Sequence, residues 1–552
     1  MIKIATRGSR LALKQSGLVQ NMLKEKAGLE TELSVVKTTG DRIQDVPLSL
    51  VSGAGFFTRE IENALLSGTA QIAIHSLKDL PIVQPPELKV SALPKRENPA
   101  DIIVTRTENI DDSQSLHLKA GLSVGTSAIR RQAQIKSLRP DLRVRELRGN
   151  VTTRLDKVRS GEYDAVVIAY AGLLRVDIDY SDLEIRELRI DQFVPSPSQG
   201  ALAVETRSDD QAMIDAVHKI HDTATALAVQ AERRLLLLCG GGCHLPLGAN
   251  LSETANGYSM QVFWSFQLPD RQTAAIIFHL DTDSSDGVCD LVDQCYIKIK
   301  RFEIEQLRKY YKRENAKQRF LITRTPEQTE ELDAKLYKKN IDLISYPILN
   351  LTAYNDDLWP NVKPRLDFYK YLIFTSANAV RFFNDLLYSE NIDKNIFTET
   401  VFACVGDKTA DACREIFKSE NIIISPIATG EGLGKHLLGF EKSTALMPCA
   451  KEADFIMQET LISAGWHFDR LAIYATQSTE PENLPEVDSN SIDYICFTSS
   501  LALVYTKEKI KIPDHAVIIS IGPKTTRKIA GAGLRVDWEL PNSNLEWLWR
   551  VL

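Results

Sequence analysis

The first 300 residues alternate short apolar runs with amphipathic stretches. Short apolar runs predict strands, and apolar residues spaced three or four apart predict helices. The predicted strands are Ile2–Ala5, Leu33–Lys37, Ile72–Ile74, Ile102–Val104, Leu122–Gly125, Val144–Leu147 and Ala165–Ile168. The predicted helices are Leu11–Ala27, Thr58–Leu66, Ile129–Leu138, Val151–Arg159 and Ala226–Leu238. This alternation predicts an α/β fold that binds ligands where strand ends meet helix starts.

Two proline-containing segments divide this region. Pro94–Pro99 predicts a crossing of the chain between two lobes, and Phe193–Ser198 predicts the return. A chain that crosses out and back forms two lobes with a cleft between them. We therefore expect a first lobe of residues 1–95 plus 193–220, a second lobe of residues 96–192, and a small α+β domain of residues 221–300.

A charged stretch separates this region from the rest of the chain. Lys298–Arg319 holds nine basic and three acidic residues, with apolar residues at helical spacing. We expect a helical linker over residues 301–319. Beyond it Phe320 begins another predicted strand, so a second folded part is expected.

The second part contains an internal repeat. Tyr371–Val380 resembles Tyr494–Leu503, and Val401–Thr409 resembles Val517–Thr525. Each segment predicts a buried strand followed by a helix start, so the pairs indicate two similar α/β lobes. We assign them to residues 320–352 plus 478–552 and to residues 353–477. Generic strand–helix turns are the alternative, but on the first interpretation four N–H groups point into a shared cleft, those of Ser376, Ser499, Lys408 and Lys524.

Charge changes this picture locally. The net charge of −7 argues against a general nucleic-acid binder. Yet the segment from Ser127 to Ser160 holds ten basic residues against three acids. A solvated helix face is the alternative, but these arginines cluster at predicted helix starts, where anions bind well. We expect a polyanionic ligand.

Composition places the chain among ordinary globular proteins, with 44% apolar and 25% charged residues. No apolar run is long enough to span a membrane, and MIKIATRGSR lacks the apolar core of a signal peptide. Eight scattered cysteines do not form a disulfide framework. A cytoplasmic protein without membrane or nucleic-acid partners is expected, and we expect a monomer.

Cys239 and Cys243 enclose three glycines directly after a predicted helix. Glycines leave room for a bulky group beside Cys243, so the loop suits covalent attachment. An inert buried cysteine is one alternative. A haem loop needs Cys-x-x-Cys-His, and zinc needs a second ligand pair, so no metal is expected. Asp79, directly after the strand Ile72–Ile74, is a candidate acid or base, with helix capping as its alternative.

Five segments occur in the order seen in porphobilinogen deaminase (hydroxymethylbilane synthase), which residues 1–300 therefore resemble. They are Ala5–Leu13, His75–Pro81, Gly125–Gln132, Leu147–Leu155 and Gly241–Gly248. Residues 320–552 resemble uroporphyrinogen-III synthase through the paired Phe-Thr-Ser and Gly-x-Lys-Thr elements and Ile473–Thr476. The chain looks like a fusion of two consecutive enzymes of tetrapyrrole (haem) synthesis. The resemblance implies two periplasmic-binding-protein-like lobes with a cofactor-carrying domain, then a two-lobed flavodoxin-like part.

The first resemblance implies a dipyrromethane cofactor held by Cys243 through a thioether. Four porphobilinogens are added to it, each with loss of ammonia, and hydrolysis releases hydroxymethylbilane. Asp79 is implied to contact pyrrole N–H groups, stabilise the azafulvenium formed on deamination and carry the proton. Side chains implied to bind the cofactor are Lys78, Ser127, Arg130 and Arg131. Those implied to bind substrate are Arg7, Ser9, Arg148, Arg154, Arg175 and Gln199.

The second resemblance implies closure of hydroxymethylbilane to uroporphyrinogen III, with inversion of ring D and loss of water. Tyr474 matches the family's candidate acid, although a tyrosine with a pKa near 10 is a weak one. A strand-end aromatic is the alternative for this residue. An inactive or regulatory binding module is the alternative for the whole second part.

Some positions depart from the deaminase pattern. Ala54 stands where lysine is common, Ala128 where serine is common, and Ser198 where glycine is usual. Two other protein classes fit the sequence less well. A solute-binding protein has no use for Cys243, and the Gly430–Lys435 segment lacks the spacing of a nucleotide-binding phosphate loop.

Overall fold

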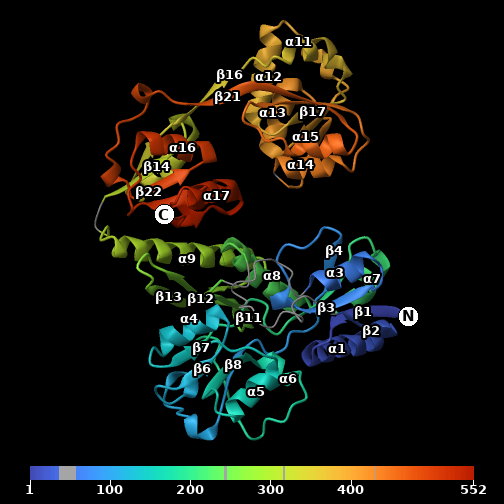
Figure 1. Ribbon diagram of the computed structural model, residues 1–552, viewed down its shortest axis with the longest axis vertical. Coiled ribbons are helices and arrows are strands. Elements are labelled where there is room, and N and C mark those ends of the chain that lie inside the picture. The colour runs from blue at the N-terminus through green and yellow to red at the C-terminus, as the bar shows by residue number, and fades with distance from the viewer. Residues whose placement is uncertain (37–57, 242–244, 315–316, 428) are drawn as a thin grey trace. The chain divides into compact units, whose positions relative to one another are not determined.

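The computed structural model describes residues 1–36, 58–241, 245–314, 317–427 and 429–552. The chain divides into two compact units (Figure 1). The first comprises Met1–Asn315 with Arg550–Leu552, and the second Ala316–Trp549. Among the described helices, none combines the length and the apolar character needed to cross a lipid bilayer.

The first unit begins with a mixed five-stranded sheet in the order β2-β1-β3-β10-β4, in which β1–β3 are parallel and β10 is antiparallel to both its neighbours. Helices α1 and α7 share one core with this sheet and α3 another. The strands are Ile2–Arg7 (β1), Thr31–Val36 (β2), Ile72–Ser76 (β3), Leu88–Ala92 (β4) and Leu202–Arg207 (β10). The helices are Arg10–Ala27 (α1), Arg59–Leu66 (α3) and Gln211–His218 (α7).

A second five-stranded sheet follows in the order β7-β6-β8-β5-β9. Helices α5 and α6 contribute to one core with this sheet, and α4 contributes to another. The strands are Asp101–Thr105 (β5), Ser123–Gly125 (β6), Arg143–Arg145 (β7), Ala165–Ala169 (β8) and Glu184–Glu187 (β9). The helices are Ile129–Leu138 (α4), Val151–Arg159 (α5) and Tyr170–Leu174 (α6). Because β10 returns to the first sheet, the chain crosses between the two lobes twice.

The remainder of the first unit is an antiparallel meander, β11-β12-β13, with two long helices. Its elements are α8 (Thr223–Leu238), β11 (Leu247–Thr254), β12 (Gly257–Gln267), β13 (Thr273–Thr282) and α9 (Val288–Tyr310). Asp222 caps α8 by accepting a hydrogen bond from the Thr225 N–H at 2.7 Å. Cys239 is the C-cap at the other end of this helix, and Gly240 and Gly241 follow it.

The second unit contains two sheets. The all-parallel sheet has the order β15-β14-β22-β23-β24, and the other, β16-β21-β20-β17-β18-β19, has one antiparallel edge strand, β16. The first comprises Gln318–Ile322 (β14), Ile341–Ser345 (β15), Tyr494–Phe497 (β22), Val517–Ser520 (β23) and Trp538–Glu539 (β24). The second comprises Leu349–Ala353 (β16), Tyr371–Phe374 (β17), Val401–Cys404 (β18), Ile422–Ile424 (β19), Thr444–Ala450 (β20) and His467–Ser478 (β21).

The helices of the second unit follow the strands. They are Glu330–Tyr337 (α10), Trp359–Val362 (α11), Ala377–Ser389 (α12), Asp407–Phe417 (α13), Gly430–Leu437 (α14), Ile456–Ser463 (α15), Ser500–Lys509 (α16), Pro523–Gly531 (α17) and Glu546–Val551 (α18). The chain passes to the second sheet between Ser345 and Leu349 and returns between Ser478 and Tyr494.

The mixed α/β class predicted from the sequence is confirmed, and α4 and α5 have the predicted bounds. The linker assignment over residues 301–319 is wrong for its first ten residues. These residues complete α9, and Ile304 and Leu307 are buried. Their apolar side chains anchor the helix despite the surrounding charge. The other lobe boundaries, and the likeness of the lobes to periplasmic binding proteins and flavodoxins, stay predictions.

Candidate active sites

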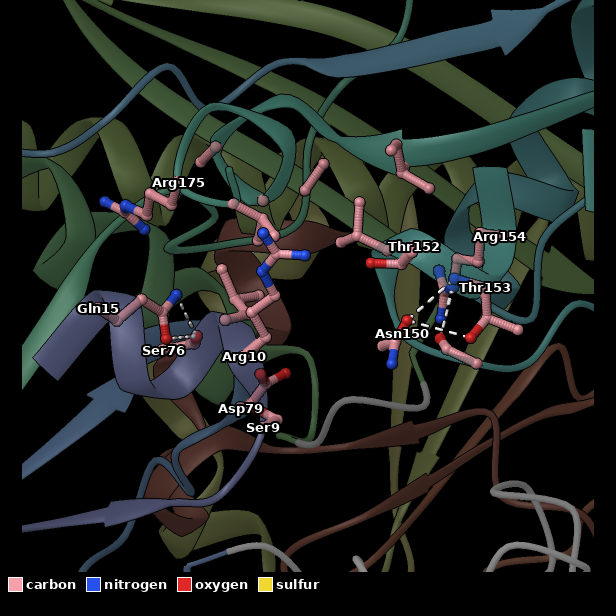
Figure 2. A pocket seen from close by; sticks show the side chains of 18 of the residues that line it. Ser9, Arg10, Gln15, Ser76, Asp79, Asn150, Thr152, Thr153, Arg154 and Arg175 are labelled. Atoms are coloured by element: carbon pink, nitrogen blue, oxygen red, sulfur yellow. Dashed lines mark hydrogen bonds between the residues drawn. The ribbon is translucent and has the colours of Figure 1, made fainter. Parts of the chain in front are cut away.

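A cavity of about 1150 Å³ lies between the two lobes of the first unit. Its walls come from the start of α1 and the end of β3 in one lobe, and from the start of α5 and the end of α6 in the other. Figure 2 shows Ser9, Arg10 and Asp79 on one side and Asn150 and Arg154 on the other. The cavity therefore lies where strand ends meet helix starts, as the sequence predicts.

The cavity is strongly cationic. Among its described lining residues one carboxylate, that of Asp79, faces seven cationic side chains. These are Arg7, Arg10, Lys78, Arg131, Arg148, Arg154 and Arg175. Guanidinium groups bind carboxylates through paired hydrogen bonds. Such a lining suits a ligand with several carboxylates and brings one protein carboxylate close to it.

Asp79 lies at the end of a 3-10 turn, Leu77–Asp79, directly after β3. Leu77 is buried, and its N–H donates to the Ala201 carbonyl at 3.0 Å. The guanidinium of Arg233, on α8, donates to the Leu77 carbonyl at 3.2 Å and to the Pro81 carbonyl at 2.6 Å. The backbone on both sides of Asp79 is thus anchored, while its exposed side chain faces the cavity (Figure 2).

Lys78 also lines the cavity, and its Nζ donates to Gln199 Oε1 at 3.2 Å. Burial lowers the pKa of Lys78 to about 8, against the attraction of neighbouring Asp79. The ammonium is therefore still the main form at neutral pH. It can bind a carboxylate, and its charge is sensitive to its neighbours.

The start of α5 supplies the opposite wall. Asn150 caps the helix, with Oδ1 accepting from the Thr153 N–H at 3.0 Å. Arg154 Nε donates to the Gly149 carbonyl at 2.9 Å, which turns the guanidinium back toward the helix start. Burial, with a smaller contribution from the charge of Arg131, lowers the pKa of Arg154 to about 10. Arg154 nevertheless stays charged at neutral pH.

Nine residues assigned to the deaminase site by resemblance line this one cavity. They are Arg7, Ser9, Lys78, Asp79, Ser127, Arg131, Arg148, Arg154 and Arg175. Within the described residues, Arg130 and Gln199 do not line it. Arg130 instead donates to the Val194 carbonyl at 2.6 Å and to Asp101 Oδ2 at 2.7 Å. Cys243 lies outside the described residues, as does Ala54.

The basic segment from Ser127 to Ser160 contributes less to the cavity than its charge indicates. Three of its ten basic residues, Arg131, Arg148 and Arg154, line the cavity. Others form ion pairs on the surface, such as Arg159 with Asp182 at 2.8 Å. The prediction of a polyanion site is compatible with this cavity, although seven of the ten basic residues are not among its described lining residues.

Arg10 lines the cavity, although the sequence did not predict it as a site residue. It is the first residue of α1, after the N-cap Ser9, and its Nη2 donates to the Asp177 carbonyl of the other lobe. Lys14, one turn later, lies with its Nζ 3.6 Å from Asp177 Oδ2. A signal for Arg10 was present in the sequence. Serine is a preferred N-cap, so Ser9 predicts that the next residue, Arg10, begins a helix close to Arg7.

The two other departures from the deaminase pattern have structural consequences. Ala128 is the N-cap of α4 and makes no side-chain cap, which a serine could supply. Ser198 has φ of 64°, a conformation that favours glycine, and its N–H donates to Glu232 Oε2 at 2.6 Å. Neither position is among the described residues that line the cavity.

In the second unit the internal repeat is confirmed as repeated geometry. Ser376 and Ser499 are the N-caps of α12 and α16, and each Oγ accepts from an N–H three residues on at 3.1 Å. Gly406 and Gly522 precede α13 and α17, which carry Lys408 and Lys524 in their first turns. Lys524 Nζ, on a helix of the first sheet, lies 3.5 Å from Asp454 Oδ2 after β20 of the second. Convergence of the four N–H groups on one cleft stays a prediction.

Tyr474 and Ser376 come together at the second sheet. The Tyr474 hydroxyl lies 3.2 Å from Ser376 Oγ, and its ring stacks on Phe382 with centroids 4.8 Å apart. Burial raises the pKa of Tyr474 above its ordinary value, although the hydrogen bond with Ser376 opposes the rise. The hydroxyl is thus a hydrogen-bond donor rather than a strong acid.

Comparison with known proteins follows the same division. Residues 2–215 match the family model described as porphobilinogen deaminase, dipyromethane cofactor binding domain. The porphobilinogen deaminase of Syntrophobacter fumaroxidans is 46% identical over 252 residues, which are 45% of this chain and 79% of that protein. That of Maridesulfovibrio salexigens is 44% identical over 289 residues, 52% and 87% of the two chains. The chain belongs to the porphobilinogen deaminase family.

Residues 300–550 match the family model of uroporphyrinogen-III synthase HemD. The chain thus carries the domains of two enzymes of porphyrin synthesis, a deaminase and a synthase, and both sequence resemblances are confirmed. Among solved structures, a mutant uroporphyrinogen III synthase from Thermus thermophilus is similar at a TM-score of 0.32 and 14% identity, covering 42% of this chain and 96% of that one.

Proposed function

We propose that the first unit joins four porphobilinogens into hydroxymethylbilane on a dipyrromethane bound to Cys243, and that the second closes this product to uroporphyrinogen III. Four ammonia molecules leave during assembly, one water enters at release, and one water leaves on closure. The observation that carries the proposal is the cavity lining, to which the described residues contribute one carboxylate, that of Asp79, and seven cationic side chains. The domain matches support the same pair of reactions.

The lining residues fit a dipyrromethane with acetate and propionate side chains. Arg131 and Lys78 offer donors on the cavity wall, where Ser127 also lies, and Gly241, the last described residue before Cys243, has φ of 66°. Such a backbone conformation favours glycine. When bound, the dipyrromethane supplies the pyrrole carbon from which the product chain grows.

We assign two tasks to Asp79, which lines the cavity. Loss of ammonia from porphobilinogen leaves positive charge on the pyrrole, and a fixed carboxylate stabilises that charge where it develops. The same carboxylate can accept a pyrrole N–H hydrogen bond and carry a proton toward the departing amine. Because Arg233 anchors the backbone around it, Asp79 needs little rearrangement during each addition. The arginines meanwhile neutralise the substrate carboxylates.

Intact-mass measurement of the purified full chain tests the first reaction. We expect an added mass of two porphobilinogen units less two ammonia molecules. Cys243→Ser should abolish it, whereas Cys289→Ser, at an exposed cysteine elsewhere, should retain it. A wild-type chain without the added mass after incubation with porphobilinogen would remove the deaminase proposal.

For the second reaction we assign two roles. Tyr474, whose hydroxyl lies 3.2 Å from Ser376 Oγ, would donate a hydrogen bond to the departing hydroxyl. The helix starts of the two lobes would bind the carboxylates of the substrate. The test is the isomer formed when the full chain is given porphobilinogen. We expect the rearranged isomer III. Unrearranged isomer I alone would show that the second unit does not catalyse closure and would favour a binding module.

A further inference from the structure

Asp101, the first residue of β5, is a fully buried carboxylate bonded to the cavity residue Arg131. Its Oδ1 accepts from Arg131 Nη2 at 2.7 Å, and its Oδ2 accepts from Arg130 Nη2 at 2.7 Å. Burial alone would raise the pKa of Asp101, but the two guanidinium groups hold it well below its ordinary value. Asp101 is thus a permanent negative charge that orients Arg131, one of the cavity cations.

Gln199 extends this network to the other lobe. Its Nε2 donates to Asp101 Oδ1 at 2.8 Å and to the Pro99 carbonyl at 2.8 Å, while its Oε1 accepts from Lys78 Nζ at 3.2 Å. The reverse amide orientation would set oxygen against carboxylate and nitrogen against ammonium, so the network fixes the amide. Gln199 is 1% exposed. It directly follows one crossing between the lobes, Phe193–Ser198, and it binds Pro99 at the end of the other.

Lys78 is therefore connected to a buried charge that it does not touch. The charged groups that act on it are Asp79 and Asp101, which favour the ammonium, and Arg131 and Arg130, which oppose it. Two guanidinium groups beside a buried lysine would favour its neutral form if Asp101 were absent. The Gln199 carbonyl oxygen adds an acceptor to which the charged ammonium donates a stronger hydrogen bond than the neutral amine would.

We infer that Asp101 and Gln199 are positioning residues that hold Arg131 in place and keep Lys78 protonated while the acidic substrate is bound. This inference rests on the proposed function of the first unit and adds a role for two residues that do not line the cavity. It predicts that activity falls at alkaline pH as the Lys78 ammonium loses its proton. It also predicts that this alkaline limb moves when the network is cut.

Gln199→Leu cuts the network while leaving Asp101 paired with both arginines. We expect the cofactor to load as in the wild type by intact mass. The alkaline limb of kcat/KM for porphobilinogen should shift to lower pH by about one unit. Competitive acetylation of Lys78, followed by peptide mass spectrometry, should show the same shift without any activity assay. An unchanged limb together with unchanged Lys78 labelling would overturn the inference.

Asp101→Asn removes the charge itself. We expect a larger shift in Lys78 labelling and a cofactor load at least about fivefold lower, because Arg131 loses its partner. Full loading with a wild-type pH profile would contradict the inference; if this variant does not fold, Gln199→Leu decides alone. The matched control is Asp141→Asn. The Asp141 carboxylate lies 2.8 Å from Arg139 Nη2, and neither residue is among those lining the cavity. This variant should leave both the Lys78 labelling and the cofactor load unchanged.

Failure of the inference and failure of the proposed function give different results. Absence of the covalent mass in the wild-type chain would contradict the deaminase reaction itself. Its presence in wild type and Gln199→Leu, with identical Lys78 labelling in both, would contradict only the role of the network.

Discussion

The two units differ in how their candidate sites carry charge. The cavity of the first unit is lined by seven cationic side chains around one carboxylate. The candidate site of the second unit contains two serine caps, two lysines in first helical turns, and a buried tyrosine. Under the proposed function both bind the same class of acidic pyrrole chain, so the difference reflects what each does with it.

A chain that remains attached through several additions needs its carboxylates neutralised at every stage. Guanidinium groups provide charge and direction together, and Asp101 holds one of them rigidly. A single closure step needs its substrate folded rather than retained, and helix N–H groups and hydroxyls can orient carboxylates with less net charge. The first site should therefore depend on individual charges, and the second on several weak contacts.

The largest expected effect is at Asp79. Asp79→Asn should lower deaminase kcat by about 10² to 10⁴, because it removes the acid–base group while retaining shape. Closure of supplied hydroxymethylbilane by the same protein should be unchanged. Steady-state rates of ammonia release and of isomer III formation measure the two halves separately. Equal loss of both activities would show that the units are not functionally independent.

Individual cavity arginines should come next. Arg148→Gln or Arg154→Gln removes one guanidinium from the lining and should lower kcat/KM for porphobilinogen about tenfold to a hundredfold, the effect of losing one charged hydrogen bond of 1.5–3 kcal/mol. Arg143→Gln is the matched control, because Arg143 donates to the Gly121 carbonyl at 3.1 Å and does not line the cavity. If the control loses as much, general charge rather than direct binding explains the effect.

Much of the first site follows from the sequence, for a physical reason. Strand ends are local, so Asp79 could be singled out directly after a predicted strand, and the family resemblance added Ser9. Both residues line the cavity. Long-range pairing could not be placed. Nothing local shows that Asp101 binds Arg130 and Arg131, or that Arg159 pairs with Asp182, and these partners decide which cations face the ligand.

The errors in element bounds have the same cause. Val144–Leu147 was expected as a strand, but β7 ends at Arg145. Leu147 is fully buried, yet its N–H donates to Ser127 Oγ at 3.1 Å instead of continuing the sheet. An apolar residue marks burial, while a partner 20 residues away determines whether its backbone belongs to a strand.

Tyr474→Phe should have a modest effect on closure, of about threefold to tenfold in kcat, the size expected when one neutral hydrogen bond is lost. Ser376→Ala removes both the hydroxyl partner and the α12 cap, so it should cost stability as well, by about 1 kcal/mol. Closure by wild type and Tyr474→Phe should have the same alkaline limb below about pH 10, because burial raises the pKa of Tyr474. A limb that disappears in Tyr474→Phe would make the tyrosine an essential acid and would weaken the contrast between the sites.

The smallest effect is expected at Lys524. Its ion pair with Asp454 spans 3.5 Å between largely exposed side chains, so Lys524→Gln should change the free energy of unfolding by less than about 0.5 kcal/mol. If Lys524 also attracts the carboxylates of hydroxymethylbilane, KM for closure should rise about twofold to fivefold and the salt dependence of KM should weaken. Asp454→Asn separates the two roles, because it breaks the same pair but leaves the lysine available for substrate. A rise in KM in both variants would assign the effect to the pair between the lobes; a rise in Lys524→Gln alone would assign it to substrate binding, making the second site a milder version of the first.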